Sequence, residues 1–417
     1  MGKRATKTVV PRLRFREFSA DPHWSSVSIG EASIPVAERV GGRKLTAVSI
    51  SAGVGFVPQT EKFGRDISGN QYALYTLVRY GDFVYNKGNS LKFPQGCVYQ
   101  LRGWREVAAP NVFISFRLKQ GFVPEYFQYC FENNIHGVQL RSHITSGARS
   151  NGLLNVSKEQ FFGVRIPAPR RSEQQKIADC LTSLDEVIAA QGRKVDALKA
   201  HKRGLMQQLF PRMSETGPRL RFPEFCDAPE WTQKLGGELF ANRKEDGEEG
   251  LPIYSVTVND GMIPRASFDR DFYDIEDPAK NKKACEGDIA YNMMRMWQGA
   301  QGVAVEDCLV SPAYVVLSPR DDVCSMFFAY LLKLTQSLEL LTAHSRGLTK
   351  DRLRLYFDDF ARMPLCVPEH AEQQRIAECL SSLDARITAE TRQLAALKTH
   401  KQGLMQQLFP TPEAAGA

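Results

Sequence analysis

Two long stretches of the chain carry a heptad pattern of hydrophobic positions. Within 173–211, and again within 372–410, apolar residues recur in alternating steps of four and three against a polar background. This repeat is typical of a coiled-coil helix and not of a helix that lies on a broad core. The pattern predicts two helices, each roughly 55 Å long. The expected interface positions are Ile177, Leu181, Leu184, Ile188, Gln191, Val195, Leu198, Leu205 and Leu209, and Ile376, Leu380, Leu383, Ile387, Glu390, Leu394, Leu397, Leu404 and Leu408.

The two stretches are copies of one another. Both end in Gly-Leu-Met-Gln-Gln-Leu-Phe-Pro, and the segment 11–15, Pro-Arg-Leu-Arg-Phe, recurs at 218–222. An apolar stripe of this length would promote aggregation on a lone helix, so each helix needs a partner. The duplication favours an antiparallel pair within the chain, and pairing with a second subunit is the alternative. In an intrachain pair, Gln191 and Glu390 would form a polar layer at the midpoint, and we expect the ammonium groups of Lys202 and Lys401 to reach water.

The regions between the repeats differ strongly in sequence. Both mix short β-branched or aromatic runs, at 112–117 and 314–317, with predicted helices at 124–133 and 324–337. The fold class is therefore α+β, with two globular domains separated by a pair of long helices that form an antiparallel coiled coil with an internal pseudo-two-fold repeat. The expected boundaries are 1–19 for an N-terminal tail, 20–168 for the first domain, 169–215 for the first helix, 216–367 for the second domain, 368–411 for the second helix and 412–417 for a tail.

Polar and basic segments stand at matching places in the two domains. A Gly-Asp turn at 81–82 and at 287–288 leads into a short apolar strand that ends in Asn, and a basic loop lies near the end of each domain. Arg side chains can read guanine, Asn can read adenine, and Lys can hold phosphates, although such a loop can equally be a solvated turn. The candidate DNA-binding residues are Asn86, Lys87, Arg141, Arg149, Asn151, Asn292, Arg295, Arg346, Lys350 and Arg352.

Composition adds little to this picture. A net charge of +7 and a pI near 8.9 point only weakly to a polyanionic partner. The hydrophobic fraction of 43% and the absence of a long apolar run are typical of a folded cytoplasmic protein. Nine scattered cysteines without a Cys-x-x-Cys pair match neither a zinc site nor a disulfide framework, so we expect no metal site.

Motifs for catalysis are missing from the sequence. It contains no Walker A pattern, no dinucleotide-binding glycine loop and no Asn-Pro-Pro-aromatic element of the kind used to methylate exocyclic amines. The nearest approach to a nuclease cluster is the acidic segment 274–277, which has no counterpart in the other half of the chain. We therefore expect no catalytic residues and no cofactor in this chain.

The duplicated layout resembles the specificity (S) subunits of type I restriction-modification systems, the HsdS family. The resemblance lies in 169–211 with its Ser-Glu-Gln-Gln-Lys-Ile-Ala start, in 368–410 with Ala-Glu-Gln-Gln-Arg-Ile-Ala, and in the stretch 287–300. It covers essentially the whole chain.

The resemblance implies a division of labour between this chain and its partners in a prokaryotic cytoplasm. The two globular regions would be target-recognition domains that each read half of a bipartite, asymmetric site in double-stranded DNA. The helices would set the gap between half-sites and dock two methyltransferase (M) subunits, which restriction and translocase (R) subunits would join. Adenine-N6 methylation and ATP-dependent cleavage, with S-adenosylmethionine, ATP and Mg, would belong to the partners.

Two other functions remain open on the sequence alone. The chain could be a coiled-coil scaffold, or a dimeric protein that binds DNA non-specifically or binds protein, without a restriction role. An enzyme with a nuclease centre around Glu276 is the second alternative, and it predicts metal-dependent cutting by the isolated chain.

Overall fold

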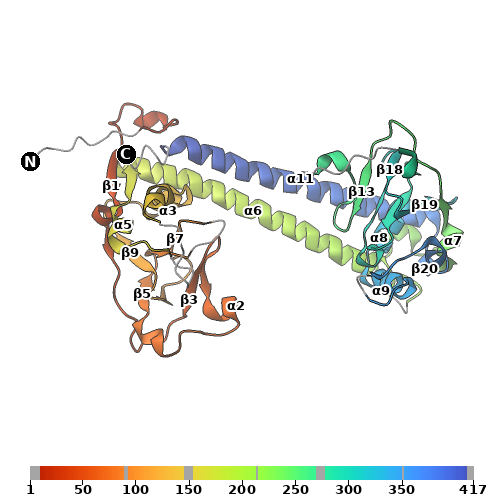
Figure 1. The fold of residues 1–417 in the computed structure, drawn as a ribbon, viewed down its shortest axis with the longest axis horizontal. Helices are drawn as coiled ribbons and strands as arrows, with labels where there is room; N and C mark the ends of the chain where they lie inside the picture. Colours follow the sequence, from red (N-terminus) through yellow and green to blue (C-terminus); the bar gives the residue numbers. More distant parts are fainter. Residues whose placement is uncertain are drawn as a thin grey trace, which may run out of the picture. The chain divides into compact units, whose positions relative to one another are not determined.

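The computed structural model describes residues 10–88, 93–144, 154–212, 215–268, 278–349 and 352–410. The chain folds as two compact units (Figure 1). Unit 1 comprises Met1–Gly192 and Gln393–Ala417, and unit 2 comprises Arg193–Arg392. The boundaries fall inside the long helices α6 (Arg171–Leu209) and α11 (His370–Leu408). Each unit therefore contains one globular region and a part of both helices.

Unit 1 is built on a four-stranded antiparallel sheet in the order β2-β9-β6-β7, accompanied by the pairs β1-β10, β3-β4 and β5-β8. In strand β6 (Phe83–Asn86), Phe83 and Tyr85 face the main core, whereas Val84 faces a smaller cluster on the opposite side. Both faces are buried, which explains why the strand is a continuous apolar run. The other strands are β1 (Ser25–Ser28), β2 (Ser33–Pro35), β3 (Val48–Ser51), β4 (Gly55–Pro58), β5 (Thr76–Arg79), β7 (Cys97–Gln100), β8 (Glu106–Ala109), β9 (Ile114–Leu118) and β10 (Arg165–Ala168).

Unit 2 repeats this topology strand for strand. Its central sheet has the order β12-β19-β16-β17, and the pairs β11-β20, β13-β14 and β15-β18 correspond to those of unit 1. In β16 (Ile289–Asn292), Ile289 and Tyr291 face the main core and Ala290 faces the smaller cluster. The other strands are β11 (Thr232–Leu235), β12 (Phe240–Arg243), β13 (Tyr254–Thr257), β14 (Gly261–Pro264), β15 (Lys282–Ala284), β17 (Gln301–Val303), β18 (Cys308–Val310), β19 (Tyr314–Pro319) and β20 (Pro364–Val367).

Short helices pack against the face of each central sheet that borders the main core. The helix predicted at 124–133 is confirmed as α3 (Pro124–Glu132), but the single helix predicted at 324–337 is wrong. The chain turns after α8 (Ser325–Leu331), and α9 (Thr335–His344) starts anew, so that Phe328 and Leu341 reach the same core from two helices. The remaining helices are α1 (Ile29–Ala32), α2 (Gln59–Phe63), α4 (Ile135–Leu140), α5 (Lys158–Gly163), α7 (Gly236–Leu239) and α10 (Phe357–Phe360).

The parts of α6 and α11 that meet within one unit run antiparallel. In unit 2, Lys202 Nζ lies 2.6 Å from Asp384 Oδ2, so the end of α6 lies beside the start of α11. In unit 1, Lys401 Nζ lies 2.7 Å from Asp185 Oδ1, so the end of α11 lies beside the start of α6. This is the direction that the duplication favoured. Gln191 belongs to unit 1 and Glu390 to unit 2, so their polar layer stays a prediction.

The heptad positions are covered as the pattern predicts. Every expected interface residue is buried or partly buried, whereas most of the positions between them are exposed. Burial is nearly complete near the helix starts, where Ile177 and Ile376 are each 1% exposed, because the globular region covers the helix there. Positions near the middle, such as Ile188 and Leu198, are only partly buried.

Lys202 and Lys401 are partly buried, with side chains 20% and 16% exposed, and both ammonium groups make ion pairs. The ammonium group of Lys202 sits 4.8 Å from the centre of the Tyr330 ring, and its ion pair with Asp384 is supported by a 2.8 Å hydrogen bond that the Tyr330 hydroxyl donates to the same carboxylate. Lys401 has the same arrangement over the Tyr129 ring. Charge pairing and the aromatic face compensate each lysine for lost hydration. Each lysine thus connects the end of one long helix to the globular region of its unit.

A second joint explains the repeated Glu-Gln-Gln at the helix starts. Glu173 is fully buried, and both of its carboxylate oxygens accept hydrogen bonds of 2.7 Å from Arg14. Glu372 and Arg221 repeat this bidentate pair at 2.9 and 2.7 Å. These bonds raise the pKa of both arginines. The pair ties the N-terminal segment of each unit to a long helix.

The glutamine that follows ties the helix to the globular region. Gln174 Oε1 accepts a hydrogen bond of 3.0 Å from the amide of Val123, the N-cap residue of α3. Gln373 Oε1 accepts the equivalent hydrogen bond from the amide of Cys324, the N-cap residue of α8. A side-chain acceptor at a helix N-terminus satisfies an amide that has no partner within the helix. The residues that the duplication preserves are therefore those that make the joints.

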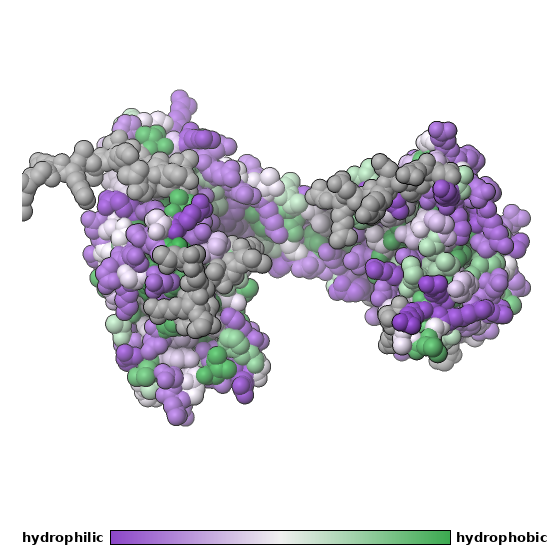
Figure 2. Space-filling view, in the orientation of Figure 1, coloured by the Kyte–Doolittle hydropathy of each residue, from purple (hydrophilic) through white to green (hydrophobic). Residues whose placement is uncertain are grey.

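The surface of each unit is largely polar. Figure 2 shows hydrophilic residues over most of the visible face of both units, with hydrophobic residues in small groups between them. In the described part of the chain, no helix has the length and hydropathy needed to cross a bilayer. All nine cysteines are free.

Candidate nucleic-acid interface

Two segments that the sequence marked separately lie together in each unit. In unit 1 the amide of Leu154, which follows the basic loop, donates a hydrogen bond of 2.8 Å to the carbonyl of Lys87. In unit 2 the amide of Leu355 donates a hydrogen bond of 3.0 Å to the carbonyl of Met293, the residue equivalent to Lys87. In each unit the residue that follows the basic loop therefore lies beside the strand end, and we call the strand end with the described part of its basic loop surface 1 in unit 1 and surface 2 in unit 2.

In surface 1, Asn86 serves the protein's own structure. Its side-chain Nδ2 donates to the carbonyl of Ile50 at 2.7 Å, and its Oδ1 accepts from the amide of Gly88 at 2.7 Å. These bonds shape the turn after β6, which favours a structural role over base reading. Arg141 is exposed at the start of a short 3₁₀ turn, and Lys87 is partly buried. Arg149 and Asn151 lie outside the described residues.

Surface 2 has the same turn at its strand end. Asn292 Oδ1 accepts a hydrogen bond of 2.9 Å from the amide of Met294, which matches the Asn86–Gly88 bond. The turn leaves Met294 43% exposed and Arg295 exposed as well. Asn292 therefore builds the turn, and the exposed Arg295 stays a candidate for contact with DNA.

Arg346 fastens the basic loop of surface 2. Its guanidinium lies 2.6 Å from Asp359 Oδ2 and donates a hydrogen bond of 2.7 Å to Asp359 Oδ1, and its backbone forms a bridge in both directions with Arg354. The hydrogen bond from Arg346 is the main reason that the pKa of Asp359 is lowered. Because the Arg346 guanidinium is paired with Asp359, a structural role for Arg346 is favoured over guanine reading. Lys350 lies outside the described residues.

Basic side chains alternate with buried leucines where this loop returns to the core. Arg352 and Arg354 are exposed, whereas Leu353 and Leu355 are 8% and 0% exposed. This period of two places both arginines on one outer face. Arg354 and the exposed Leu348 of the same loop were missed from the sequence. The alternation of arginine and leucine at 352–355 is the signal that could have revealed Arg354.

The Gly-Asp turns that precede β6 and β16 each hold an arginine, but from different strands. In unit 1, Arg117 on β9 donates a hydrogen bond of 2.6 Å to the buried Asp82. In unit 2 the arginine is Arg243 on β12, and it lies 2.5 Å from the buried Asp288. The carboxylate thus keeps an arginine partner although the arginine comes from another strand. Hydrogen bonding to Asp288 raises the pKa of Arg243.

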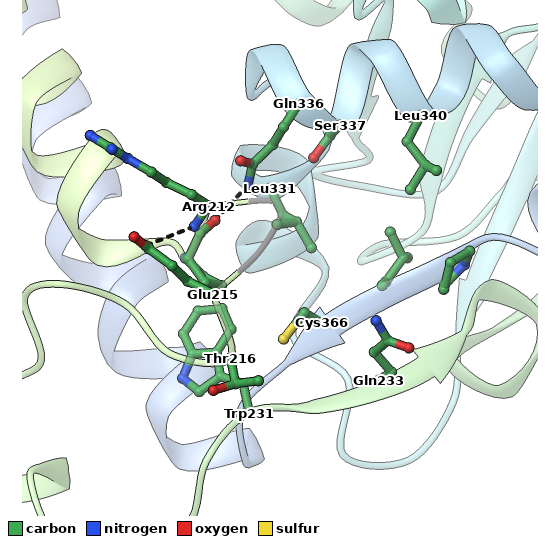
Figure 3. Close-up of a pocket in the computed structure, with 13 residues that line it drawn as sticks. Arg212, Glu215, Thr216, Trp231, Gln233, Leu331, Gln336, Ser337, Leu340 and Cys366 are labelled. Atoms are coloured by element: carbon green, nitrogen blue, oxygen red, sulfur yellow. Dashed lines mark hydrogen bonds between the residues drawn. The ribbon is translucent and has the colours of Figure 1, made fainter.

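A pocket of about 540 Å³ lies at the joint region of unit 2 (Figure 3). It is bordered by Trp231, Leu331, Leu340 and Cys366, and Gln336 closes one side by donating a hydrogen bond of 2.6 Å to the carbonyl of Pro211. Its lining combines apolar side chains with polar ones, among them Arg212, Glu215 and Gln233.

Metal-binding chemistry is not apparent in the described residues. Within 10–88, 93–144, 154–212, 215–268, 278–349 and 352–410, no three His, Cys, Asp or Glu side chains are grouped so that they could hold an ion. The acidic segment 274–277, with Glu276, lies outside these ranges.

Comparison with known proteins gives one consistent family. Residues 243–399 match the model of the type I restriction modification DNA specificity domain. The type I restriction enzyme MjaVIII specificity subunit of Methanocaldococcus jannaschii is 24% identical over 64% of this chain and 66% of its own length. The putative type I restriction enzyme MjaX specificity subunit of the same organism is 22% identical over 82% of this chain and 81% of its own. The chain thus spans slightly less than two thirds of the first relative.

Two solved structures share the fold. The S subunit of a type I restriction-modification system from M. genitalium superimposes with a TM-score of 0.58 at 14% identity, covering 96% of this chain and 99% of that one. A chain from a study of complex assembly and conformational transition of the type I R-M system gives 0.51 at 19% identity, covering 94% and 97%.

Residues 243–399 are thus similar to a DNA specificity domain, and the chain shares its fold with a solved S subunit. Over much of its length the chain is similar to curated specificity subunits of type I restriction enzymes.

Proposed function

We propose that this chain is the DNA sequence-recognition subunit of a type I restriction-modification complex. The observation that carries the proposal is the pair of equivalent surfaces, one in each unit, on a chain whose residues 243–399 match a DNA specificity domain. Exposed Arg141, Arg295, Arg352 and Arg354 offer both phosphate contacts and base contacts. Specificity subunits are in general non-catalytic, which agrees with a role in reading DNA for partner enzymes.

The two units support reading of an asymmetric, bipartite site. Their strand topology is the same, but their exposed residues differ, so each unit would recognise its own half-site. A symmetric dimer of one recognition domain would instead read a palindrome. Two methyltransferase subunits and the restriction subunits would supply catalysis together with S-adenosylmethionine, ATP and Mg.

We further propose that α6 and α11 form the antiparallel coiled coil that sets the gap between half-sites. Both helices have 39 residues and begin in one unit and end in the other. The exposed face of the helices would be the docking surface for methyltransferase subunits.

Methylation mapping tests the function directly. The full-length chain is expressed with a type I methyltransferase subunit in a host that lacks its own system, and modified adenines are located by sequencing. We expect a single asymmetric motif in two parts. The matched control is Arg352→Ala with Arg354→Ala, which should weaken or change the unit 2 half-site and leave the other half-site intact. A palindromic motif, or equal binding to every sequence, would contradict the proposal.

The helix proposal has its own test. Inserting one heptad into the middle of both helices should preserve the two half-sites and change the number of base pairs between them. An unchanged gap would refute the spacer role while leaving the recognition role intact.

A further inference from the structure

Leu348 is the most exposed large hydrophobic residue of the described chain. Its side chain is 99% exposed, whereas the next such residue, Val54, is 72% exposed. Single exposed apolar residues are common on protein surfaces, so exposure alone carries little weight. What sets Leu348 apart is the basic loop that holds it, whose described residues are 346–349 and 352–354 and which is named here the Leu348 loop.

The base of the Leu348 loop is fastened at several points. The backbones of Arg346 and Arg354 exchange hydrogen bonds of 2.9 and 2.8 Å, and the Arg346 guanidinium is held by Asp359. The loop then joins the strand end through the Leu355–Met293 bond. A side chain presented by a fastened loop loses less conformational entropy on binding than one on a free loop.

The turn itself depends on a glycine beside Leu348. Gly347 has φ of +155°, and a Cβ atom at this position would lie 2.6 Å from the carbonyl oxygen of Arg352. The two sides of the loop are therefore too close for any other residue without a backbone shift. Leu348 directly follows this close approach and lies outside the core.

Exposed arginines lie on the same loop as this apolar side chain and on the neighbouring strand end. Arg352 and Arg354 are exposed on the outer face of the same loop, and Arg295 is exposed on the strand-end segment that the loop contacts. The loop lies within residues 243–399, which match a DNA specificity domain, and exposed arginines suit the phosphates that flank a DNA groove. The occupant that fits is therefore duplex DNA, with the arginines at the phosphates and Leu348 at the bases.

We propose that Leu348 is a specificity-determining residue that packs against the C5-methyl group of a thymine in the major groove. The methyl group is the apolar feature that distinguishes thymine there. Insertion of Leu348 between base pairs is the other apolar contact with DNA, but unstacking a step costs about as much as burying one leucine gains. This proposal rests on the proposed DNA-recognition function and identifies one element of the half-site read by unit 2.

The test is a double-mutant cycle in which Leu348 of the protein and a thymine of the DNA are changed separately and together. The full-length chain first selects its site from a random duplex library, and each thymine of the selected site is then replaced by deoxyuridine, which lacks only the methyl group. We expect one replacement to weaken wild-type binding roughly fourfold, as for the loss of one buried methyl-sized group. Leu348→Ala should weaken binding to the thymine site roughly tenfold and should be insensitive to that replacement.

Control variants separate the methyl contact from general effects. Val305→Ala removes another exposed apolar side chain of unit 2, 70% exposed, and should change nothing. Leu348→Ile keeps an apolar tip and should retain most of the sensitivity to deoxyuridine.

Each other outcome counts against the proposal. Additive effects of Leu348→Ala and deoxyuridine would overturn it, as would a selected site without thymine in the affected half. A 2-aminopurine probe that brightens on binding, with no response to deoxyuridine, would show insertion instead. If the wild-type chain enriches no sequence, the recognition function itself fails, whereas enrichment that Leu348→Ala leaves unchanged refutes only the role of Leu348.

Discussion

The globular regions of units 1 and 2 have the same strand order and the same joints but different chemistry around them. The pairs Arg14–Glu173 and Arg221–Glu372 are superimposable in their bonding, as are the two lysines that sit over tyrosine rings. Three residues after those tyrosines, however, unit 1 has Glu132 and unit 2 has Lys333. The comparison teaches that the repeated residues preserve the framework, while the positions beside them are free to diverge and to give each unit its own charge and pH response.

Breaking the buried joint should produce the largest effect. Glu173→Ala leaves Arg14 without its carboxylate partner in a site where the Arg14 and Glu173 side chains are 14% and 0% exposed, and Glu372→Ala does the same to Arg221. Removing one partner of a buried pair costs about 3–5 kcal/mol. Hydrogen-exchange mass spectrometry should show faster exchange of segment 12–24 for Glu173→Ala and of segment 219–231 for Glu372→Ala.

The control for this prediction is Glu186→Ala, an exposed carboxylate on the same helix as Glu173, which should change neither segment. Equal acceleration of both segments by either joint variant would mean that the two joints are not independent.

The next effect should distinguish the units by pH. His136 in unit 1 is 2% exposed, and burial lowers its pKa to about 4, whereas unit 2 has Ser337 seven residues after the equivalent tyrosine. Because the folded state disfavours the protonated ring, the unfolded chain binds more protons between pH 6.5 and 4. The stability of unit 1 should therefore fall by roughly 3 kcal/mol as the pH falls through that window.

Exchange of unit 1 and unit 2 peptides, corrected for the intrinsic effect of pH, would measure this loss. His136→Asn should lower the stability of unit 1 at pH 7 because it disturbs packing, but it should flatten the pH dependence. A wild-type profile with equal acid sensitivity in both units would contradict the assignment to His136.

The smallest effect should come from making unit 2 resemble unit 1. Burial, together with the neighbouring Lys202, lowers the pKa of Lys333, whereas Glu132 accepts a 3.2 Å bond from Lys401. Lys333→Glu would replace a like-charge neighbour with an opposite one and should stabilise unit 2 by about 1 kcal/mol. Glu132→Lys should destabilise unit 1 by a similar amount, and urea denaturation followed in each unit is the measurement. A destabilising Lys333→Glu would show that Lys333 has another partner.

The sequence predicted some of these features and could not predict others. The two long helices followed from their heptad pattern, because burial along a helix repeats in sequence. The common topology of the globular regions did not, because strands β6 and β16 are buried on both faces and unrelated apolar residues, such as Val84 and Ala290, fill the same place. A doubly buried strand has no alternation from which its faces can be read.

The sequence predicted which segments form the candidate site, but not the roles of the residues within them. Asn86, Asn292 and Arg346 stood out as polar residues near basic loops, yet all three are engaged in turns or an ion pair. The partner of Arg346 is Asp359, and the spacing of these two residues in the sequence does not predict that they pair. Arg141, Arg295 and Arg352 remain predictions for DNA contact.

The division of the long helices between the units also determines when each unit can fold during synthesis. Unit 2 is one continuous stretch, Arg193–Arg392, and needs nothing that is translated later. The main core of unit 1 includes Met405, Leu408 and Phe409, close to the end of the chain. Although most of unit 1 is translated before unit 2, its core stays incomplete until residues 405–409 have been made, so unit 2 is the first that can be finished.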